Sequence, residues 1–496
     1  ISYTGWAVRS GGTSGTLCNS VSVLADGSSI VTGKFQGTAT FGSTTLTSAG
    51  SNDVFVAKLD AGGDYQWATR AGGNASEDSH SVSVLADGSS IVTGKFENTA
   101  TFGNTTLTSA GDSDVFVAKI DANGDYQWAA RAGGKDANVG QSVSVLTDNS
   151  SIVTGYFRGA ATFGNTTLTS EGGYDVFIAK IDATGTYEWA TRAGGKTSEY
   201  SKSVSVLDDG SSIVTGKFEN TATFGNTTLT SAGSMDVFVA KVNATGDYEW
   251  ATSAGGNSSE DSYSVSVLAD GSSIVTGYFK ETASFGNTTL TSAGRGDVFV
   301  AKLDAAGDYE WATQAGGEYD DYSVGISALA DGSSIVTGHF QGHPTFGNTT
   351  LESDGNAEVF VAKLDAGGVY QWATRASGGI GDLGFGEGVS FLADGSSIVT
   401  GYFQGTATFG NIALTSEGGY DAFVAKLDAN GSFDGIAVPD DADLIINTQA
   451  DTTFGGTVSD LATLTTDNGG STIAKADITT TGNQTYNDEF VLNTSL

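Results

Sequence analysis

Short runs of β-branched and aromatic residues alternate with small polar residues along most of this chain, and they end at glycine-containing turns. The stretch 80–128 shows the pattern clearly, with Val-Ser-Val-Leu, Ser-Ile-Val-Thr-Gly and Val-Phe-Val-Ala-Lys as its apolar runs. Asp-Gly at 87–88 and Asp-Ala-Asn-Gly at 121–124 separate these runs, and such pairs supply the positive φ angles that tight hairpins need. The pattern therefore predicts four antiparallel strands, at 81–86, 90–96, 114–120 and 126–132.

The same pattern returns at a fixed interval. Tryptophan stands at positions 6, 67, 128, 189, 250, 311 and 372, always 61 residues apart. A repeat of this length indicates that each copy buries its apolar face against its neighbours, because one copy cannot bury that face alone. All-β units of four strands in seven copies predict a seven-bladed β-propeller, in which radial packing leaves only short strand edges.

The two ends of the repeat region complement one another. Residues 2–12 have the pattern of a fourth strand without the first three, whereas the last copy, 390–427, has its first three strands and Gly435 where a tryptophan is expected. We therefore expect residues 2–9 to pair with 421–427 and close the ring, so that a propeller domain spans 1–435. Residues 436–496 form a separate Thr-rich segment with short, irregularly spaced β runs.

The repeated motif resembles the bacterial β-propeller repeat family known as SBBP. That family's pattern joins Asp-x-Phe-Val-Ala-Lys-Leu-Asp-x-x-Gly to Trp, Gly-Gly and a strand ending in Val-Thr-Gly, which stand here at 53–63, Trp67, 72–73 and 31–33. The resemblance covers about residues 2–430, with small departures such as Glu358 and Asn243 in place of Asp. It implies a propeller fold in a module of a secreted or surface protein, and it implies little about activity.

Charge narrows the range of partners and locations. The chain has 57 acidic and 22 basic residues, hence a net charge of −35, which excludes nucleic acid and disfavours anionic membranes as partners. Salt screens such a surface, so we expect an extracellular or cell-surface protein of a bacterium from a saline or marine setting.

Two further features concern the covalent state of the chain and its relation to membranes. No apolar run is long enough for membrane insertion, and the single Cys18 excludes a disulfide framework. Because the chain begins with Ile1 rather than Met, we expect a processed chain or a piece of a longer one.

Seven copies within one chain help to separate scaffold from site, because a residue that recurs in every copy serves packing. The Asp53 and Lys58 series are of this recurring kind, and the Arg70 series follows the same logic except at Ser253 and Gln314. The connections from the fourth strand of one copy to the first strand of the next vary most, and in a four-stranded blade they share a face with the connections between the second and third strands. We expect any ligand on that face. Its candidate residues are Glu77, Asp78, Glu199, Tyr200, Glu260, Asp261, Tyr263, Tyr319, Asp320, Asp321, Asp382 and Phe385.

Acids beside aromatic rings could bind a divalent cation such as calcium or stack on a sugar. The plainer alternative is that these loops only keep the protein soluble. The three histidines His80, His339 and His343 form no metal-binding motif, and no Ser-His-Asp order or phosphate loop appears. We therefore expect no enzymatic activity, no catalytic residue, no bound transition metal and no cofactor, with calcium as the exception that stays open.

Residues 451–490 resemble a unit of the large filamentous-haemagglutinin-like bacterial surface adhesins. The resemblance rests on Phe-Gly-Gly-Thr-Val at 454–458 and Thr-Thr-Gly-Asn-Gln-Thr-Tyr-Asn-Asp at 480–488. A lone β segment gains order most readily by adding strands to the sheet edge of a partner. The apolar residues that we expect to be buried in such an assembly are Phe454, Leu461, Leu464, Phe490 and Leu492.

Two functions are compatible with these observations. The first is a non-enzymatic structural or adhesive protein, a rigid disc with a β tail that assembles head to tail into an extracellular filament or joins other domains of the same polypeptide. The alternative is a lectin-like module that holds a glycan or a cation on its variable face. A binding module should show one set of loops that departs sharply from the sevenfold average, whereas a structural subunit should bury its termini against neighbours. Only the loop at 377–390 departs much, which favours the structural role.

Overall fold

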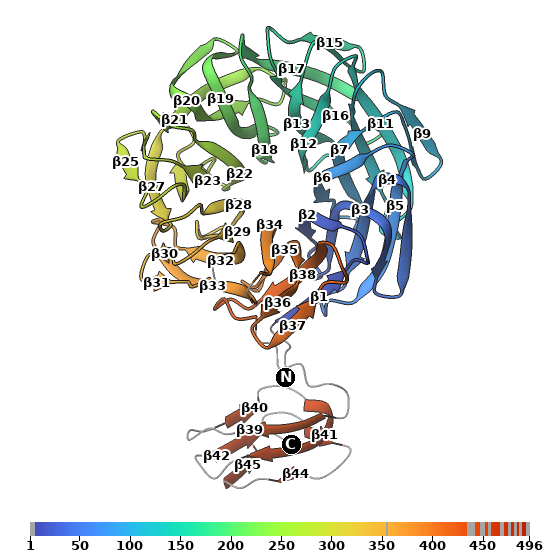
Figure 1. Cartoon of the computed structure of the whole chain (residues 1–496), viewed down its shortest axis with the longest axis vertical. Helices are drawn as coiled ribbons and strands as arrows, with labels where there is room; N and C mark the ends of the chain where they lie inside the picture. Colours follow the sequence, from blue (N-terminus) through green and yellow to red (C-terminus); the bar gives the residue numbers. More distant parts are fainter. Residues whose placement is uncertain are drawn as a thin grey trace.

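The computed structural model describes residues 5–353, 356–379 and 381–433 and, beyond these, the backbone of the strands between 442 and 492. Every regular element in these parts is a β-strand. The described residues contain no helix that is long and apolar enough to cross a membrane. The sheets stand radially around a central opening, as Figure 1 shows, and they form a β-propeller. The predicted all-β propeller is therefore confirmed.

One repeat shows how the pattern becomes a sheet. Its strands are β6 (Glu77–Val84), β7 (Ser90–Phe96), β10 (Asp114–Ile120) and β11 (Tyr126–Gly134). Neighbouring strands are antiparallel, with β6 innermost and β11 outermost. The predicted second and third strands have the predicted bounds. The first begins four residues earlier, because a bulge between Ser79 and Ser81 lets β6 follow β7 as far as Phe96, and it ends two residues earlier, at Val84. The fourth ends two residues later, because the end of β11 pairs with β14 (Ala160–Phe163).

The same order of pairing recurs along the chain. The corresponding sets are β2 (Thr16–Val23), β3 (Ser29–Phe41), β4 (Thr44–Leu59) and β5 (Tyr65–Gly73); β12 (Asn138–Val145), β13 (Ser151–Phe157), β16 (Asp175–Ile181) and β17 (Tyr187–Gly195); β18 (Tyr200–Val206), β19 (Ser212–Phe224), β20 (Thr227–Val242) and β21 (Tyr248–Gly256); β22 (Asp261–Val267), β23 (Ser273–Phe279), β26 (Asp297–Leu303) and β27 (Tyr309–Ala315); and β28 (Tyr322–Ala328), β29 (Ser334–Phe340), β32 (Glu358–Leu364) and β33 (Tyr370–Gly378).

The first strand of the chain completes the last sheet. That sheet contains β34 (Leu383–Phe391), β35 (Ser397–Gln404) and β38 (Asp421–Leu427), and its outer strand is β1 (Trp6–Ser10). β1 runs antiparallel to β38, with Trp6 opposite Lys426 and Ser10 opposite Ala422. The expected pairing of the two ends is confirmed from Trp6 onward.

A small hairpin from each repeat covers the outer strand of the preceding sheet. In the second repeat it consists of β8 (Thr99–Phe102) and β9 (Thr105–Thr108), and Phe102 pairs with Ala71 of β5. This pairing occupies a strand edge that would otherwise be open. The equivalent short strands are β14 (Ala160–Phe163), β15 (Thr166–Thr169), β24 (Thr282–Phe285), β25 (Thr288–Thr291), β30 (Thr345–Phe346), β31 (Thr349–Thr350), β36 (Thr406–Phe409) and β37 (Ile412–Thr415).

The repeated tryptophans clamp each sheet to the next. Trp67 Nε1 donates a hydrogen bond of 3.0 Å to the carbonyl oxygen of Ala122, and its ring lies against Gly124. At Gly124 φ is +93°, and a Cβ there would lie 2.9 Å from the indole. The turn therefore needs glycine both for its backbone angle and for its closeness to the ring. Trp6 makes the same bond to Ala61 across the point of ring closure, at 3.0 Å.

The recurring acid of the third strand pairs with the recurring arginine of the fourth. Asp53 accepts from Arg70 at 2.5 Å, and Asp114 accepts from Arg131 at 2.6 Å. The carboxylates of these two aspartates are fully buried, whereas both guanidinium groups are about one-third exposed. These residues serve the scaffold, which explains why they recur.

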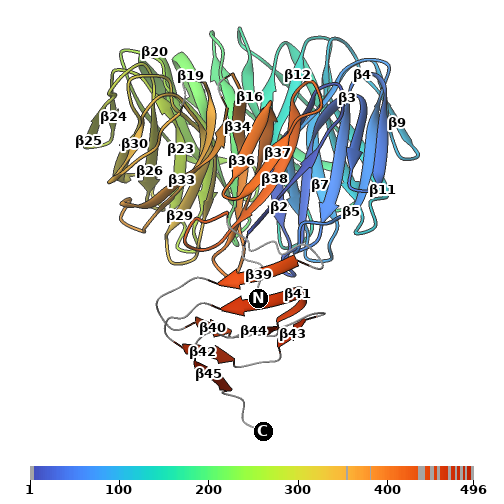
Figure 2. The same cartoon turned by 60° about the horizontal axis from the view of Figure 1, so that its bottom comes forward.

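The tail strands pair with one another. They are β39 (Ala442–Ile446), β40 (Thr452–Phe454), β41 (Val458–Thr466), β42 (Ser471–Ala474), β43 (Ile478–Thr480), β44 (Gln484–Thr485) and β45 (Glu489–Leu492) (Figure 2). Every pairing between them is parallel. The tail therefore has internal strand partners, which the sequence did not lead us to expect. The side chains of the assembly candidates Phe454, Leu461, Leu464, Phe490 and Leu492 lie outside the described residues.

Candidate binding site in the central channel

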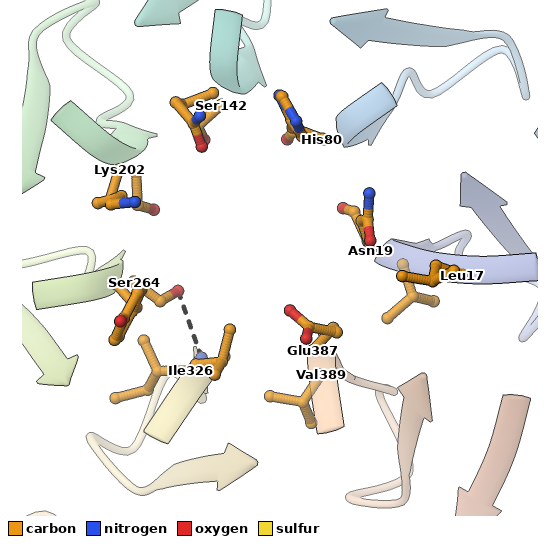
Figure 3. A pocket seen from close by; sticks show the side chains of 18 of the residues that line it. Leu17, Asn19, His80, Ser142, Lys202, Ser264, Ile326, Glu387 and Val389 are labelled. Carbon is orange, nitrogen blue, oxygen red and sulfur yellow. Dashed lines mark hydrogen bonds between the residues drawn. The ribbon is translucent and has the colours of Figure 1, made fainter. Parts of the chain in front are cut away.

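The innermost strands β2, β6, β12, β18, β22, β28 and β34 surround a cavity of about 780 Å³ on the propeller axis (Figures 1 and 3). This volume lies within the range of about 300–1,000 Å³ that is typical of small-molecule sites. Two tiers of side chains line it. One tier repeats from strand to strand and the other does not.

The repeating tier consists of serines that join neighbouring inner strands. Ser20 Oγ accepts a hydrogen bond of 3.2 Å from the backbone N–H of Val82, and Ser81 Oγ accepts one of 3.2 Å from Val143. The same bond recurs from Val204 to Ser142, from Val265 to Ser203 and from Ile326 to Ser264, at 3.2–3.3 Å. The Val-Ser-Val repeat thus ties adjacent sheets together around the channel.

The variable tier comes from the bulges. In each inner strand the pairing shifts by one residue, as between Cys18 and Ser20, and the extra residue carries its side chain toward the channel. Figure 3 shows Asn19, His80, Lys202 and Glu387 placed around the open centre. The bulge residues are Asn19, His80, Gln141, Lys202, Tyr263, Val324 and Glu387. No two of them are alike, although the residues that follow them repeat as Ser-Val-Ser-Val in the first five of these strands.

One part of the ring is polar and centres on Asp78. Its carboxylate lies 2.7 Å from Lys34 Nζ and 3.4 Å from His80 Nε2, and it accepts a hydrogen bond of 3.3 Å from Asn19 Nδ2. Burial alone would raise the pKa of Asp78, but His80 and Lys34 outweigh burial and hold that pKa at about 2. Asp78 is therefore ionised and fully engaged with its neighbours.

A second ion pair joins Lys217 Nζ to Asp261 at 2.7 Å. Burial raises the pKa of Asp261, although Lys217 and Lys202 act against this rise. The two lysines also lie over aromatic rings: Lys217 Nζ is 5.7 Å from the centroid of Tyr200, and Lys202 Nζ is 5.5 Å from that of Tyr263. Burial lowers the pKa of Lys202, because its ammonium group is held in a poorly solvated place.

The other part of the ring is an aromatic arc, which we define as Tyr263, Tyr278, Tyr322, His339, Phe385, Tyr402 and Tyr420. Successive rings have centroids 6.0, 4.6, 5.1, 4.9, 5.0 and 5.4 Å apart. A separate group, Tyr156, Tyr174 and Tyr200, has centroids 4.9–5.6 Å apart. Burial lowers the pKa of His339 to about 4, so this ring is neutral near pH 7.

These aromatic contacts also hold sheets together. The position of Lys34 on the second strand faces the position of Asp78 on the next inner strand. The equivalent positions hold two tyrosines at Tyr156 and Tyr200 and a histidine with a phenylalanine at His339 and Phe385. An ion pair and an aromatic pair thus fill the same gap between sheets, and this structural role explains part of the arc.

Glu387 carries the carboxyl group of the variable tier. It lies at the bulge of β34, and Tyr402 makes a side-chain hydrogen bond to it. Burial raises the pKa of Glu387 to about 7, while Tyr402, Lys34 and Lys202 act to lower it. This carboxyl is therefore partly protonated near neutrality.

The structure divides the predicted site residues into two groups. Asp78, Tyr200, Asp261, Tyr263 and Phe385 lie around the channel, in its lining or packed against it. The others lie between or outside the sheets: Glu77, Glu199, Glu260, Tyr319, Asp320, Asp321 and Asp382 do not line the cavity.

The prediction that Glu77, Glu199, Glu260 and Asp321 present their carboxylates on variable loops was wrong. All four are fully buried. They accept hydrogen bonds of 2.8–3.0 Å from the backbone N–H of Gly73, Gly195, Gly256 and Gly317. Asp382 accepts in the same way from Gly379 at 2.8 Å. Glu77 is the first residue of β6, and Glu199, Glu260 and Asp321 each directly precede an inner strand, so these acids lie under the connection and cap it.

Sequence reasoning missed the channel residues Asn19, Lys34, Gln141, Lys202, Tyr278, Glu387 and Tyr402, and also Lys217, which pairs with Asp261. A signal for the variable tier was present, since the residue before the repeated serine, or before Gly325 and Gly388 that replace it, is different in each copy. Within the described part of the chain no group of three or more His, Cys, Asp or Glu side chains is arranged to hold a metal ion.

Comparison with known proteins gives similarity at the level of the repeat fold. No family model matches the chain. An uncharacterized WD repeat-containing protein of Acanthamoeba polyphaga mimivirus is 23% identical over 473 residues, covering 77% of this chain and 34% of its own. The regulatory protein FlaEY of Caulobacter vibrioides is 24% identical over 356 residues, covering 66% and 36%. The chain thus spans about a third of the length of these relatives.

Two solved structures match this chain with low TM-scores. Sqt1 from Chaetomium thermophilum matches with a TM-score of 0.41 and 9% identity, over 80% of this chain and 82% of its own. A protein of unknown function from Dyadobacter fermentans matches with a TM-score of 0.40 and 9% identity, over 86% and 99%. The radial sheets described above and the similarity to a WD repeat-containing protein together identify the chain as a β-propeller repeat protein.

Proposed function

We propose that this protein is a seven-bladed propeller of 61-residue blades, closed by β1, which acts as a non-enzymatic recognition module of a bacterial extracellular or cell-surface protein. The regular pairing order of the strands supports the blade count, and the SBBP resemblance supports the location. Its ligand binds at the mouth of the central channel.

The contrast between the two tiers of the channel carries this proposal. The serines and valines of the inner strands repeat because each joins its sheet to the next. The bulge residues have no such uniform task, yet they meet around one cavity and differ at every position. A site that recognises an asymmetric ligand needs different side chains around it. We therefore expect the copies of a repeat to differ at the positions that face such a site.

The nature of the lining favours a glycan over a cation. The acids predicted for cation binding are mostly occupied in capping backbone N–H groups or in ion pairs with lysine. Calcium prefers several free oxygen ligands around one point. Aromatic faces beside amide side chains are instead suited to sugars, which combine apolar C–H faces with hydroxyl groups.

The test is a binding screen with the full chain against immobilised glycans, short peptides and divalent cations. We expect one class to bind, and we expect the double variant Lys202→Ala/Glu387→Ala to weaken that binding by about tenfold or more. Val369→Ala, at a 60% exposed position in a turn far along the blade from the channel lining, is the matched control. Binding that survives the double variant would contradict recognition in the channel.

A second function has support from the tail. Leu444, Leu464 and Gln484 occupy adjacent positions in successive parallel strands, at an interval of 20 residues. Regularly spaced parallel strands stack into an elongated β structure, and each such stack ends in strands that can pair further. This arrangement supports the adhesin resemblance and a structural or adhesive role, in which the tail joins copies of the protein or other domains of the same polypeptide head to tail.

A further inference from the structure

The charged groups of the channel balance one another, although the whole chain carries a net charge of −35. Apart from the two histidines, the charged residues that line the cavity are Lys34, Asp78, Lys202 and Glu387. Two are basic and two are acidic. Lys34 and Asp78 are already paired at 2.7 Å. A buried charge on a ligand needs an opposite charge to offset its lost hydration. The charged groups of this lining already have partners: Lys34 and His80 contact Asp78, the ammonium group of Lys202 lies over the ring of Tyr263, and Glu387 is hydrogen-bonded to Tyr402.

The uncharged groups of the lining form two unlike arcs. On one side lie the aromatic side chains Tyr263, Tyr278, Tyr322 and Tyr402, carried by β22, β23, β28 and β35. On the other side β2 and β12 carry the amides Asn19 and Gln141. An amide both donates and accepts hydrogen bonds, as a hydroxyl group does. A ring face attracts the slightly positive hydrogens of an apolar C–H surface.

From these arcs and this charge balance we infer that the channel mouth binds the end of a neutral saccharide chain, which lays its C–H faces on the tyrosine arc and turns its hydroxyl groups to Asn19, Gln141 and Glu387. The inference rests on the proposed recognition function and names its ligand class. Glu387 suits this task because its carboxyl, hydrogen-bonded to Tyr402, can meet a sugar hydroxyl as donor or acceptor.

The cavity also limits how the saccharide enters. The arc lies where the inner strands begin and the second strands end, at the face that carries the connections between sheets, since Tyr322 is the first residue of β28 and Tyr402 lies near the end of β35. Deeper in the channel the valines of the repeating tier, such as Val143 and Val204, form its lining. The polar and aromatic groups are thus concentrated at one end, which favours a chain end over a chain that threads the propeller.

The experiment measures binding of neutral tetrasaccharides of glucose and of galactose, and of the matching uronic acid oligomers, to the full chain by isothermal titration calorimetry. We expect a neutral oligomer to bind, with an affinity that changes less than about twofold between about 0.1 M and about 1 M NaCl, because no ion pair forms with the ligand. Tyr278→Ala and Gln141→Ala should each weaken binding by about tenfold, and Val369→Ala should not.

Each other outcome has a defined meaning. If the chain prefers the uronic acid oligomers, or if salt strongly weakens saccharide binding, the inference of a neutral saccharide is overturned. If the channel variants lose binding in that case, the proposed recognition in the channel still holds. Absence of saccharide binding also overturns the inference, and the peptide and cation screen then decides the proposed function separately. Saccharide binding that neither channel variant weakens overturns both. Melting curves of the variants confirm that they are folded, and Gln141→Ala tests the amide arc without disturbing the ring contacts of Tyr278.

Discussion

At the scale of single residues, the buried acids of this protein have roles that their positions in the sequence conceal. Glu77 and Asp53 lie on either side of Gly72, where an added Cβ would meet both carboxyl groups within 2.8 Å. One oxygen of each, Glu77 Oε1 and Asp53 Oδ1, is buried without a hydrogen-bond partner among the described residues. Burial raises the pKa of Glu77 to about 7. A protonated Glu77 is therefore the form that the folded state favours.

This pair makes stability depend on pH. The pKa of Glu77 is about 7 in the folded chain against 4.5 for the free group, so the folded state holds a proton that the unfolded state releases. The resulting stabilisation is complete below about pH 4.5 and is lost as the pH rises toward 7. We expect the melting temperature to be higher at pH 5 than at pH 8. Glu77→Gln should reduce this difference and be at least as stable as the parent at pH 8.

The control for this prediction is Asp64→Asn, at an exposed position in the turn before β5. It should leave the pH dependence of the melting temperature as it is in the parent. Equal pH dependence in the parent and in Glu77→Gln, measured by calorimetry from pH 5 to pH 8, would contradict the role of Glu77. Glu199 and Glu260, whose pKa values burial also raises to about 7, provide repeat tests within the same chain.

At the scale of elements, the position of β1 decides whether the ring is closed. β1 is the outer strand of the last sheet, and Trp6, which is 8% exposed, packs with residues of the first repeat such as Leu59. Arg9 also pairs with the buried Asp421 at 2.7 Å. A strand from the start of the chain thus supplies contacts to both ends of the repeat region.

Deletion of residues 1–12 should therefore destabilise the propeller strongly. The loss of a buried tryptophan alone costs about 3–5 kcal/mol, and the deletion also opens an edge of β38 and leaves Asp421 without its arginine. Differential scanning calorimetry measures the effect. Removal of residues 436–496 is the matched control, which should leave the main transition in place. A melting temperature that resists the first deletion would argue against a stabilising closure by β1.

At the scale of the whole molecule, two parts built by different rules share one chain. The propeller joins antiparallel sheets around an axis, whereas the tail strands pair only in parallel. Parallel pairing, here between residues about 18–20 positions apart, extends a stack in one direction, while radial pairing closes on itself. The proposed assembly through the tail and the proposed recognition in the channel are therefore independent functions.

The tail proposal predicts that self-association depends on residues 436–496. Sedimentation velocity of the full chain should show larger species as its concentration rises, because the end of a parallel stack pairs with another copy. A variant that ends at Gly435 should stay folded and monomeric. The double variant Lys202→Ala/Glu387→Ala should associate like the parent. A full chain that remains monomeric at high concentration would refute assembly and leave recognition as the sole proposal.

Much of the local structure could be predicted from the pattern of residues. The strands 90–96 and 114–120 have their predicted bounds because their apolar runs are buried on both faces and each run is bounded on one side by a turn that needs glycine, at Gly88 and Gly124. The pairing of β1 with β38 followed from a strand missing at one end and present at the other. The strand bounds depend on neighbouring residues, and the ring closure depends on a difference between the first and last copies. A single sequence shows both of these features.

Only the tertiary structure decided the site. Glu77 and Asp78 lie in a strand because they pair with β7 beyond a bulge. This pairing cannot be predicted from the sequence of β6 alone. Asn19, Gln141 and Lys202 become neighbours of one cavity because radial packing brings inner strands from distant repeats to a common axis. The sequence by itself determined the repeat, the strands and the closure of the ring. The convergence of its few variable residues was decided by the packing of the sheets around that axis.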